Sequence, residues 1–252
     1  MMVSALLRTP DAGNAQGDPI EPGMRQRIKS LAAMLLIKHG YRGVSFGHIA
    51  EGLSTTRANI HYHFGNKNAL VEEVTDEYVT ATLDGFRAIW TNPDTPLAVK
   101  VDGTIAFNRR RYDLFNVDGD HGLSWSLIAR MRADSDALSP RANASVRRFA
   151  AELTGAVTIG IANAVGRGEL SASTPVEDLV LQMVGFINSA GPITQDAASF
   201  GTLERIYRAF LRTALAAYGQ SEYRAAAVPG GSGRDTSKPR LPRRPKPTSS
   251  PG

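Results

Sequence analysis

Apolar residues recur at spacings of three and four along most of this chain, and this periodicity constrains the fold more than any other feature. The clearest stretch is 203–218, where the apolar side chains form one stripe and Arg205, Arg208 and Arg212 occupy the opposite face. No segment shows the sustained alternation of apolar and polar residues that is typical of a half-buried strand. The sequence therefore predicts an all-α protein.

Capping residues, glycines and prolines divide this pattern into separate helices. A helix over 24–38 ends before Gly40, a very short one follows Ser45, and a third over 57–63 is capped by Thr56. A fourth runs from Asn66 towards Trp90. Further helices are expected from Thr95-Pro96 through Phe107, around Leu123 to Met131, from Ser139-Pro140 to Gly166, from the capping box Thr174 to Glu177, and over the final stripe.

Charge is distributed unevenly along the chain. Residues 24–70 hold seven Lys or Arg and one acid, Glu51, whereas residues 71–218 hold 14 basic and 18 acidic residues. A local positive field of this kind suits phosphate binding by release of counterions. A solvated, charged surface would give the same count, so charge alone leaves both interpretations open.

Several functional classes lack support in the sequence. There is no cysteine, which excludes disulfides and thiolate metal sites and fits a cytoplasmic location. No apolar run approaches the ~20 residues that cross a bilayer. A glycine-rich phosphate loop and a nucleophile elbow are absent. His61 and His63 are two positions apart on a helix and point in different directions, and Asp118 and Asp120 lack the later acidic ligand of a calcium loop. We therefore expect no enzyme activity, cofactor or metal.

The residues from 45 to 67 form two short predicted helices joined by the turn Leu53-Ser54-Thr55, which is the size of a helix-turn-helix. Several residues in and around these two helices form a characteristic pattern. They are Gly40-Tyr41, Val44-Ser45, Ile49-Ala50, His61-Tyr62-His63-Phe64 and Lys67 with Leu70. With these residues, the segment from Arg25 to about Val74 resembles the DNA-binding domain of TetR-family transcriptional regulators.

The sequence departs from the family pattern in two places. Leu53-Ser54-Thr55 replaces the usual Ala-Gly-Val of the turn, where a serine is less comfortable than glycine in a left-handed conformation. His61 replaces the usual tyrosine at the start of the aromatic helix end, and a neutral imidazole donates through only one nitrogen.

The resemblance implies that the helix over 57–63 enters the major groove. Arg57 would then suit guanine or phosphate, Asn59 would suit adenine, and the Ala58 methyl could touch thymine. Phosphate contacts would come from the aromatic helix end and Lys67, while Phe64 would be a core residue. The DNA-binding residues expected on this basis are Ser45, Thr55, Thr56, Arg57, Ala58, Asn59, His61, Tyr62, His63 and Lys67.

The resemblance also implies that the remaining helices bind an effector and form a homodimer. Candidate effector residues are the aromatic or polar side chains Phe107, Tyr112, His121, Trp125 and Arg130. Ordinary packing would also account for each of them. The two apolar helices near the end would build the dimer interface through Leu179, Met183, Phe186, Leu203, Ile206, Tyr207, Phe210, Leu211 and Leu215.

Four segments follow from these patterns. They are a flexible arm over 1–22, a helix-turn-helix DNA-binding domain over 23–70, a helical ligand-binding and dimerisation domain over 71–219, and a disordered, basic, proline-rich tail over 220–252. The hypothesis is a ligand-responsive, homodimeric repressor that binds a pseudo-palindromic DNA operator. The alternative is an all-α ligand-binding protein or enzyme in which the helix-turn-helix is only structural.

Overall fold

The computed structural model describes residues 23–117 and 122–226. Within these ranges the regular structure is helical, apart from one isolated antiparallel bridge between Leu170 and Gly219. The helices are α2 (Met24–His39), α3 (Phe46–Gly52), α4 (Arg57–Phe64), α5 (Lys67–Trp90), α6 (Leu97–Asp113), α7 (Leu127–Ala133), α8 (Pro140–Gly166), α9 (Val176–Asn188), α10 (Ala190–Asp196), α11 (Phe200–Tyr218) and α12 (Ser221–Ala226). The predicted all-α fold is confirmed.

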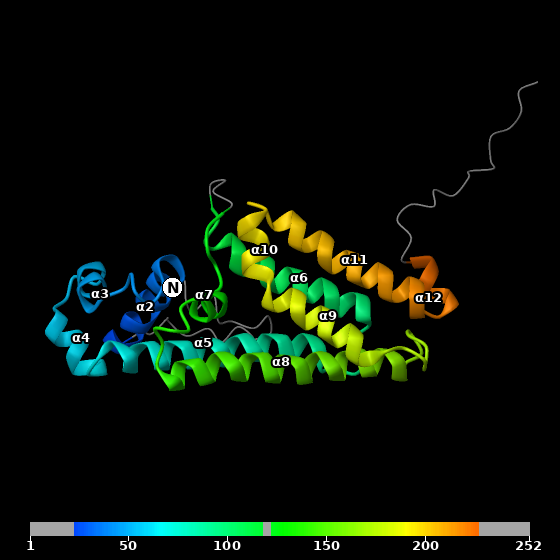
Figure 1. Ribbon diagram of the computed structural model, residues 1–252, viewed down its shortest axis with the longest axis horizontal. Coiled ribbons are helices and arrows are strands. Elements are labelled where there is room, and N and C mark those ends of the chain that lie inside the picture. The colour runs from blue at the N-terminus through cyan, green and yellow to red at the C-terminus, as the bar shows by residue number, and fades with distance from the viewer. Residues whose placement is uncertain (1–22, 118–121, 227–252) are drawn as a thin grey trace, which may run out of the picture.

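Helices α2, α3 and α4 form a small group at one end of the molecule, beside the first turns of α5 (Figure 1). Each contributes apolar side chains to a shared core, including Ile28 of α2, Ile49 of α3 and Ile60 of α4, all fully buried. Phe64 ends α4 and is buried as predicted, with the Arg25 guanidinium 4.6 Å from its ring centroid. The apolar spacing of three and four places these side chains on the inner face of each helix.

The long helices α5 and α8 lie side by side and connect this end of the molecule to the rest (Figure 1). Trp90 at the end of α5 is fully buried against Gly160 of α8, where an added Cβ would lie 2.5 Å from Trp90 Cε3 and 2.8 Å from its carbonyl oxygen. Among the described residues, α8 alone is long and apolar enough to cross a membrane by length and composition. Its packing against α5 and α9 explains this composition as that of a core helix.

Helices α6 and α9 pack on one side of the α5–α8 pair, and α10 and α11 pack in turn on α6 and α9 (Figure 1). The predicted stripe on α11 is present, and its Tyr207 is fully buried with its hydroxyl accepting a hydrogen bond of 3.0 Å from Asn108 Nδ2 of α6. Burial raises the pKa of the Tyr207 phenol. This buried polar contact orients α11 on α6, and the ion pairs Arg109–Glu204 and Arg208–Asp102 join the same two helices at their edges.

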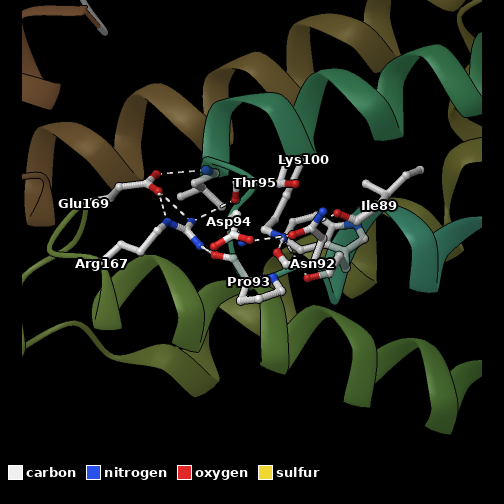
Figure 2. A network of polar contacts seen from close by, with 10 residues as sticks. Ile89, Asn92, Pro93, Asp94, Thr95, Lys100, Arg167 and Glu169 are labelled. Atoms are coloured by element: carbon white, nitrogen blue, oxygen red, sulfur yellow. Dashed lines mark hydrogen bonds and ion pairs between the residues drawn. The ribbon is translucent and has the colours of Figure 1, made fainter.

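Buried charged side chains form hydrogen bonds with the backbone of the segment that joins α5 to α6 (Figure 2). Lys100 is fully buried and donates to the carbonyl oxygens of Trp90 at 2.9 Å and Asn92 at 2.6 Å, which satisfies acceptors left free where α5 ends. Burial lowers the pKa of this ammonium group. Glu169 accepts from the backbone N–H of Leu97 at the start of α6 and pairs with Arg167. The network therefore caps two helix ends at once.

The structure corrects several predicted boundaries. Pro96 and Pro175 are themselves the N-caps of α6 and α9, so the capping box at Thr174 is wrong, and its hydroxyl donates to the Ser171 carbonyl instead. Leu123 precedes α7 in an irregular segment. Residues 221–226, predicted to begin a disordered tail, form α12, whose Tyr223 packs on the core. The arm over 1–22 and the tail from 227 lie outside the described residues.

Candidate nucleic-acid interface and ligand cavity

Two hydroxyl side chains begin the helices of the helix-turn-helix, as predicted. Ser45 Oγ accepts from the backbone N–H of His48 at 3.3 Å and starts α3, and Thr56 Oγ1 accepts from that of Asn59 at 3.2 Å and starts α4. Both hydroxyls are therefore engaged in capping. Their first structural role is to fix the orientation of the two helices.

The turn between α3 and α4 contains a serine in the left-handed region. Ser54 has φ 51°, and the next backbone N–H, that of Thr55, donates to the Ala50 carbonyl at 2.9 Å. This bond closes the turn and starts the chain towards α4. The departure of this sequence from the family's glycine therefore places a non-glycine residue where glycine is preferred.

We expect Ser54→Gly to raise the free energy of unfolding by about 0.5–1 kcal/mol, because the left-handed conformation costs a side-chain-bearing residue roughly 1–2 kcal/mol, partly offset by glycine's larger unfolded-state entropy. Urea unfolding followed by circular dichroism measures the change. Ser54→Val provides the opposite comparison and should destabilise, since a β-branched residue tolerates positive φ poorly. Equal stability of the two variants would contradict this account of the turn.

The leading end of α4 is open to solvent. Arg57 and Ala58 are exposed, and a Cβ added to Gly47 of α3 would lie 2.8 Å from Arg57 Nη2. The guanidinium therefore lies over α3 at Gly47, which has no side chain to displace it. Gly47, whose presence inside a helix is otherwise a mild cost, was not recognised from the sequence as part of this surface.

Asn59 is half-buried, and its Nδ2 donates to Thr55 Oγ1 at 3.0 Å. This contact holds the carboxamide at the start of α4, beside Thr55 and Thr56. This bond uses one amide hydrogen, so the other amide hydrogen and the amide oxygen remain available for a base edge.

The aromatic end of α4 has an exposed and an inward-facing part. Tyr62 is 84% exposed, the most of any large apolar or aromatic side chain in the described residues. The His61 ring packs edge-on against Phe46 with centroids 4.7 Å apart, and its Nδ1 lies 2.8 Å from the Gly65 carbonyl. His63 is half-buried beside Tyr62. Nε2 of His61 is thus the nitrogen left for a contact outside the chain.

Lys67 is held by the turn after α2. Its Nζ donates to the Tyr41 carbonyl at 2.5 Å and lies 4.0 Å from the centroid of the Tyr41 ring. Burial lowers the pKa of the ammonium group. Lys67 is therefore half-buried and already partnered, in contrast to the open Arg57.

The small N-terminal group is joined to the larger body by charged and polar contacts. Arg25 and Lys29 of α2 pair with Glu73 of α5, and the Arg25 hydrogen bond holds the pKa of the Glu73 carboxyl below its usual value. On the other side, Asp134 at the end of α7 accepts from the backbone N–H of Tyr41 at 2.7 Å. Both α5 and α7 therefore hold the helix-turn-helix in place. The sequence did not indicate the role of Asp134.

The predicted effector residues are only partly brought together. Phe107 and Tyr112 are buried in the core, while Arg130 pairs with Asp134 at 3.6 Å. Trp125 alone among them lines a cavity bounded by α5, α6, α7, α8, α9 and the start of α10. His121 lies outside the described residues. This cavity has a volume of about 20 Å³, enough for one water molecule. Its polar lining includes residues that were not predicted, namely Asn108, Arg111, Arg132 and Asn188.

The predicted dimer residues are divided by their burial. Most of them are buried in the core of their own chain and keep little surface for a partner, and their assignment as contact residues stays a prediction. These are Leu179, Met183, Leu203, Tyr207, Phe210 and Leu215. Phe186, Ile206 and Leu211 keep partly exposed side chains. Leu181 of α9, which was not predicted, is 69% exposed.

These features define an all-helical protein with an N-terminal helix-turn-helix on a larger helical body. Residues 28–74 match the family model described as bacterial regulatory proteins, tetR family. This match covers the helix-turn-helix segment, the part of the chain whose sequence motifs resemble the same family. Among curated proteins, none matches the chain at a significant level.

The similarity of this chain to solved structures extends over its larger helical body as well. A TetR-family regulator from Marinobacter aquaeolei has a TM-score of 0.64 at 18% identity, covering 82% of this chain and 96% of that one. The reduced form of NemR from E. coli has a TM-score of 0.61 at 14% identity, covering 74% and 94%. A protein from Saccharomonospora viridis in complex with choline has a TM-score of 0.58 at 17% identity, covering 74% and 94%. The fold of this chain is therefore similar to these structures over both the N-terminal group and the larger helical body.

Proposed function

We propose that this protein is a ligand-responsive, homodimeric transcriptional repressor of the bacterial cytoplasm that binds a pseudo-palindromic operator through α4. The observation that carries this proposal is the open leading end of α4, where Arg57 and Ala58 are exposed on a segment rich in basic residues. Arg57 and Asn59 would contact bases or nearby phosphates, while His61 and Tyr62 would contact the backbone. To contact a phosphate, Lys67 would first have to release the Tyr41 carbonyl. Otherwise it would act indirectly, by holding the turn after α2 in place.

A titration of the full chain on its own promoter DNA tests the proposal. Binding measured at several salt concentrations should weaken as salt rises, with a slope of about −0.9 in log–log form for each phosphate contacted. Binding that does not depend on salt would exclude phosphate contacts. Equal affinity for the promoter DNA and for unrelated DNA would remove the operator from the proposal.

The dimer would place two copies of α4 about 34–36 Å apart, one turn of duplex. The partly exposed apolar side chains on α9 and α11 support this arrangement, because Leu181, Ile206 and Leu211 retain surface that a partner could bury. Obligate homodimers bury on the order of 2,000 Å² or more. The interface would therefore use the outer faces of the helices whose inner faces form the core.

We expect Leu181→Glu to convert the dimer into monomers at micromolar concentration, since a charge buried in an apolar interface without a partner costs several kcal/mol. Sedimentation velocity measures the change in mass. The matched control is Val99→Glu, which places the same charge at another exposed apolar position, on α6, and should leave the dimer intact. A dimer that is unaffected by both changes would place the interface elsewhere.

Ligand response would pass through α7. Ser126, Ala129 and Arg132 of this segment line the cavity, and Asp134 at its end holds the Tyr41 backbone of the N-terminal domain. A ligand that displaces α7 would therefore shift the helix-turn-helix, to the extent that it binds one of the two positions more tightly. The similar S. viridis protein was solved in complex with choline, which supports small-molecule binding by such a helical body.

A further inference from the structure

Arg111 of α6 is a charged side chain in the core that has no carboxylate partner among the described residues. It is only 5% exposed, and its guanidinium carbon lies 5.0 Å from the Tyr78 ring centroid, 5.3 Å from that of Phe107 and 5.7 Å from that of Trp125. Its Nη2 donates to the Tyr78 hydroxyl. Stacking and one neutral acceptor offset only part of the cost of burying a cation, so this position favours an additional anion.

Arg132 of α7 reaches the same cavity from the other side. It donates to Asn188 Oδ1 at 3.1 Å and to the Asn188 carbonyl at 3.4 Å, and no described carboxylate pairs with it. Burial lowers the pKa of its guanidinium group. Two arginines thus line one small cavity with neutral polar groups around them. A negative group placed beside them would compensate the buried positive charge, which their neutral partners do only in part.

The cavity has an approach from solvent. A depression of about 630 Å³ lies beside it, lined in part by Ala150 and Pro192, and it shares Ala129, Arg132 and Asn188 with the cavity. This volume is in the range of small-molecule sites, roughly 300–1,000 Å³. Arg132 and Asn188 therefore lie between the depression, which can hold the body of a small molecule, and the cavity, which is lined by charged groups and can hold one water molecule.

We propose that this site binds a small molecule through an anionic group, a carboxylate or phosphate, that pairs with Arg132 at the edge of the cavity and directs one oxygen into it towards Arg111, while an apolar body occupies the depression. The planar donors of arginine suit both anions. The proposal rests on the proposed function only for the ligand response, because anion binding itself requires no DNA. In this proposal, recognition of the effector's anionic group depends on two arginines that lie outside the helix-turn-helix.

The first experiment compares three probes that share one body, 4-phenylbutyrate, 4-phenylbutanamide and 4-phenylbutylamine, with inorganic phosphate as a fourth. Trp90→Phe leaves Trp125 as the single tryptophan of the chain, so its fluorescence reports binding at the cavity. We expect the carboxylate to bind at least tenfold more tightly than the amide and the amine to bind least. Equal affinities, a preference for the amine, or no response to the carboxylate and phosphate at millimolar concentration would overturn the proposal.

The second experiment uses variants of the two arginines. Arg132→Met should weaken carboxylate binding about 10- to 100-fold, as expected for a charged hydrogen bond of roughly 1.5–3 kcal/mol. Arg110→Met, an exposed position on the same helix as Arg111, is the matched control and should bind normally. Unchanged binding by Arg132→Met would overturn the proposal.

Arg111→Met tests the same idea through stability. An arginine kept for a ligand should be replaceable by methionine with equal or higher melting temperature and lost anion binding, because the apolar side chain can fill the stacked position. A large fall in melting temperature would make Arg111 a structural core residue and would overturn its role. Operator binding is measured separately, so anion binding without DNA binding would refute the regulator and leave the anion site standing.

Discussion

Replacing Arg57 by alanine is expected to weaken operator binding about 5- to 150-fold, the equivalent of the 1–3 kcal/mol that an arginine contact to guanine contributes. The reason is its position at the exposed start of α4, over the glycine of α3, where no side chain of the chain competes for it. Gel shift or fluorescence anisotropy at two salt concentrations measures the loss. The salt dependence also distinguishes the two possible contacts, since losing a phosphate contact lowers the salt slope by about one and losing a base contact does not.

The matched control is Arg147→Ala, an exposed arginine on α8 that has no ion pair within the described residues. It removes the same charge and should leave operator affinity nearly unchanged. Both variants should keep the melting temperature of the parent. If Arg57→Ala bound DNA as well as Arg147→Ala does, the helix-turn-helix would be structural only, and the alternative of a ligand-binding protein or enzyme would gain support.

Replacing Trp90 by alanine is expected to lower the free energy of unfolding by about 3–5 kcal/mol, the usual cost of truncating a large buried aromatic side chain. Trp90 is fully buried where α5 meets α8, its ring lies against Gly160, and its Nε1 donates to Thr104 Oγ1 at 3.1 Å. The change leaves a cavity and removes the donor to the Thr104 hydroxyl, which keeps only its own hydrogen bond to the Lys100 carbonyl at 3.0 Å. Guanidinium unfolding of the full chain, followed by circular dichroism, measures it.

Two further variants serve as controls for the Trp90→Ala measurement. Trp90→Phe keeps most of the volume and should cost clearly less, while Val99→Ala at an exposed position of α6 should stay within about ±0.5 kcal/mol. A loss for Trp90→Ala no larger than that of Val99→Ala would mean that the contact between α5 and α8 does not hold the fold together.

Local chemistry made most of the helices predictable from sequence. The hydroxyl caps at Ser45, Thr56 and Ser139 act on backbone groups two or three residues away, so their effect depends on almost nothing distant. The same is true of the turn at Ser54. Predictions that placed a proline inside a helix failed by one residue at Pro96 and Pro175, because either neighbour can begin a helix.

The candidate site was predictable only where it coincides with local structure. The exposed residues of α4 follow from the motif, but the attachment of Lys67 to the Tyr41 carbonyl joins residues 26 positions apart. The ligand cavity was largely missed for the same reason. Arg111, Arg132 and Asn188 come from three helices, and nothing in the sequence near any of them indicates that they meet.

By itself, the sequence determined that this protein is helical, where its helix-turn-helix lies and which residues begin α4, since spacing and capping are properties of neighbouring residues. Only the tertiary structure decided which side of each apolar stripe is core. Leu203 and Tyr207 satisfy a dimer pattern but are buried in their own chain, whereas Leu181 remains open. Periodicity reports that a helix face avoids water, and it carries no information on whether the covering surface belongs to the same chain or to another.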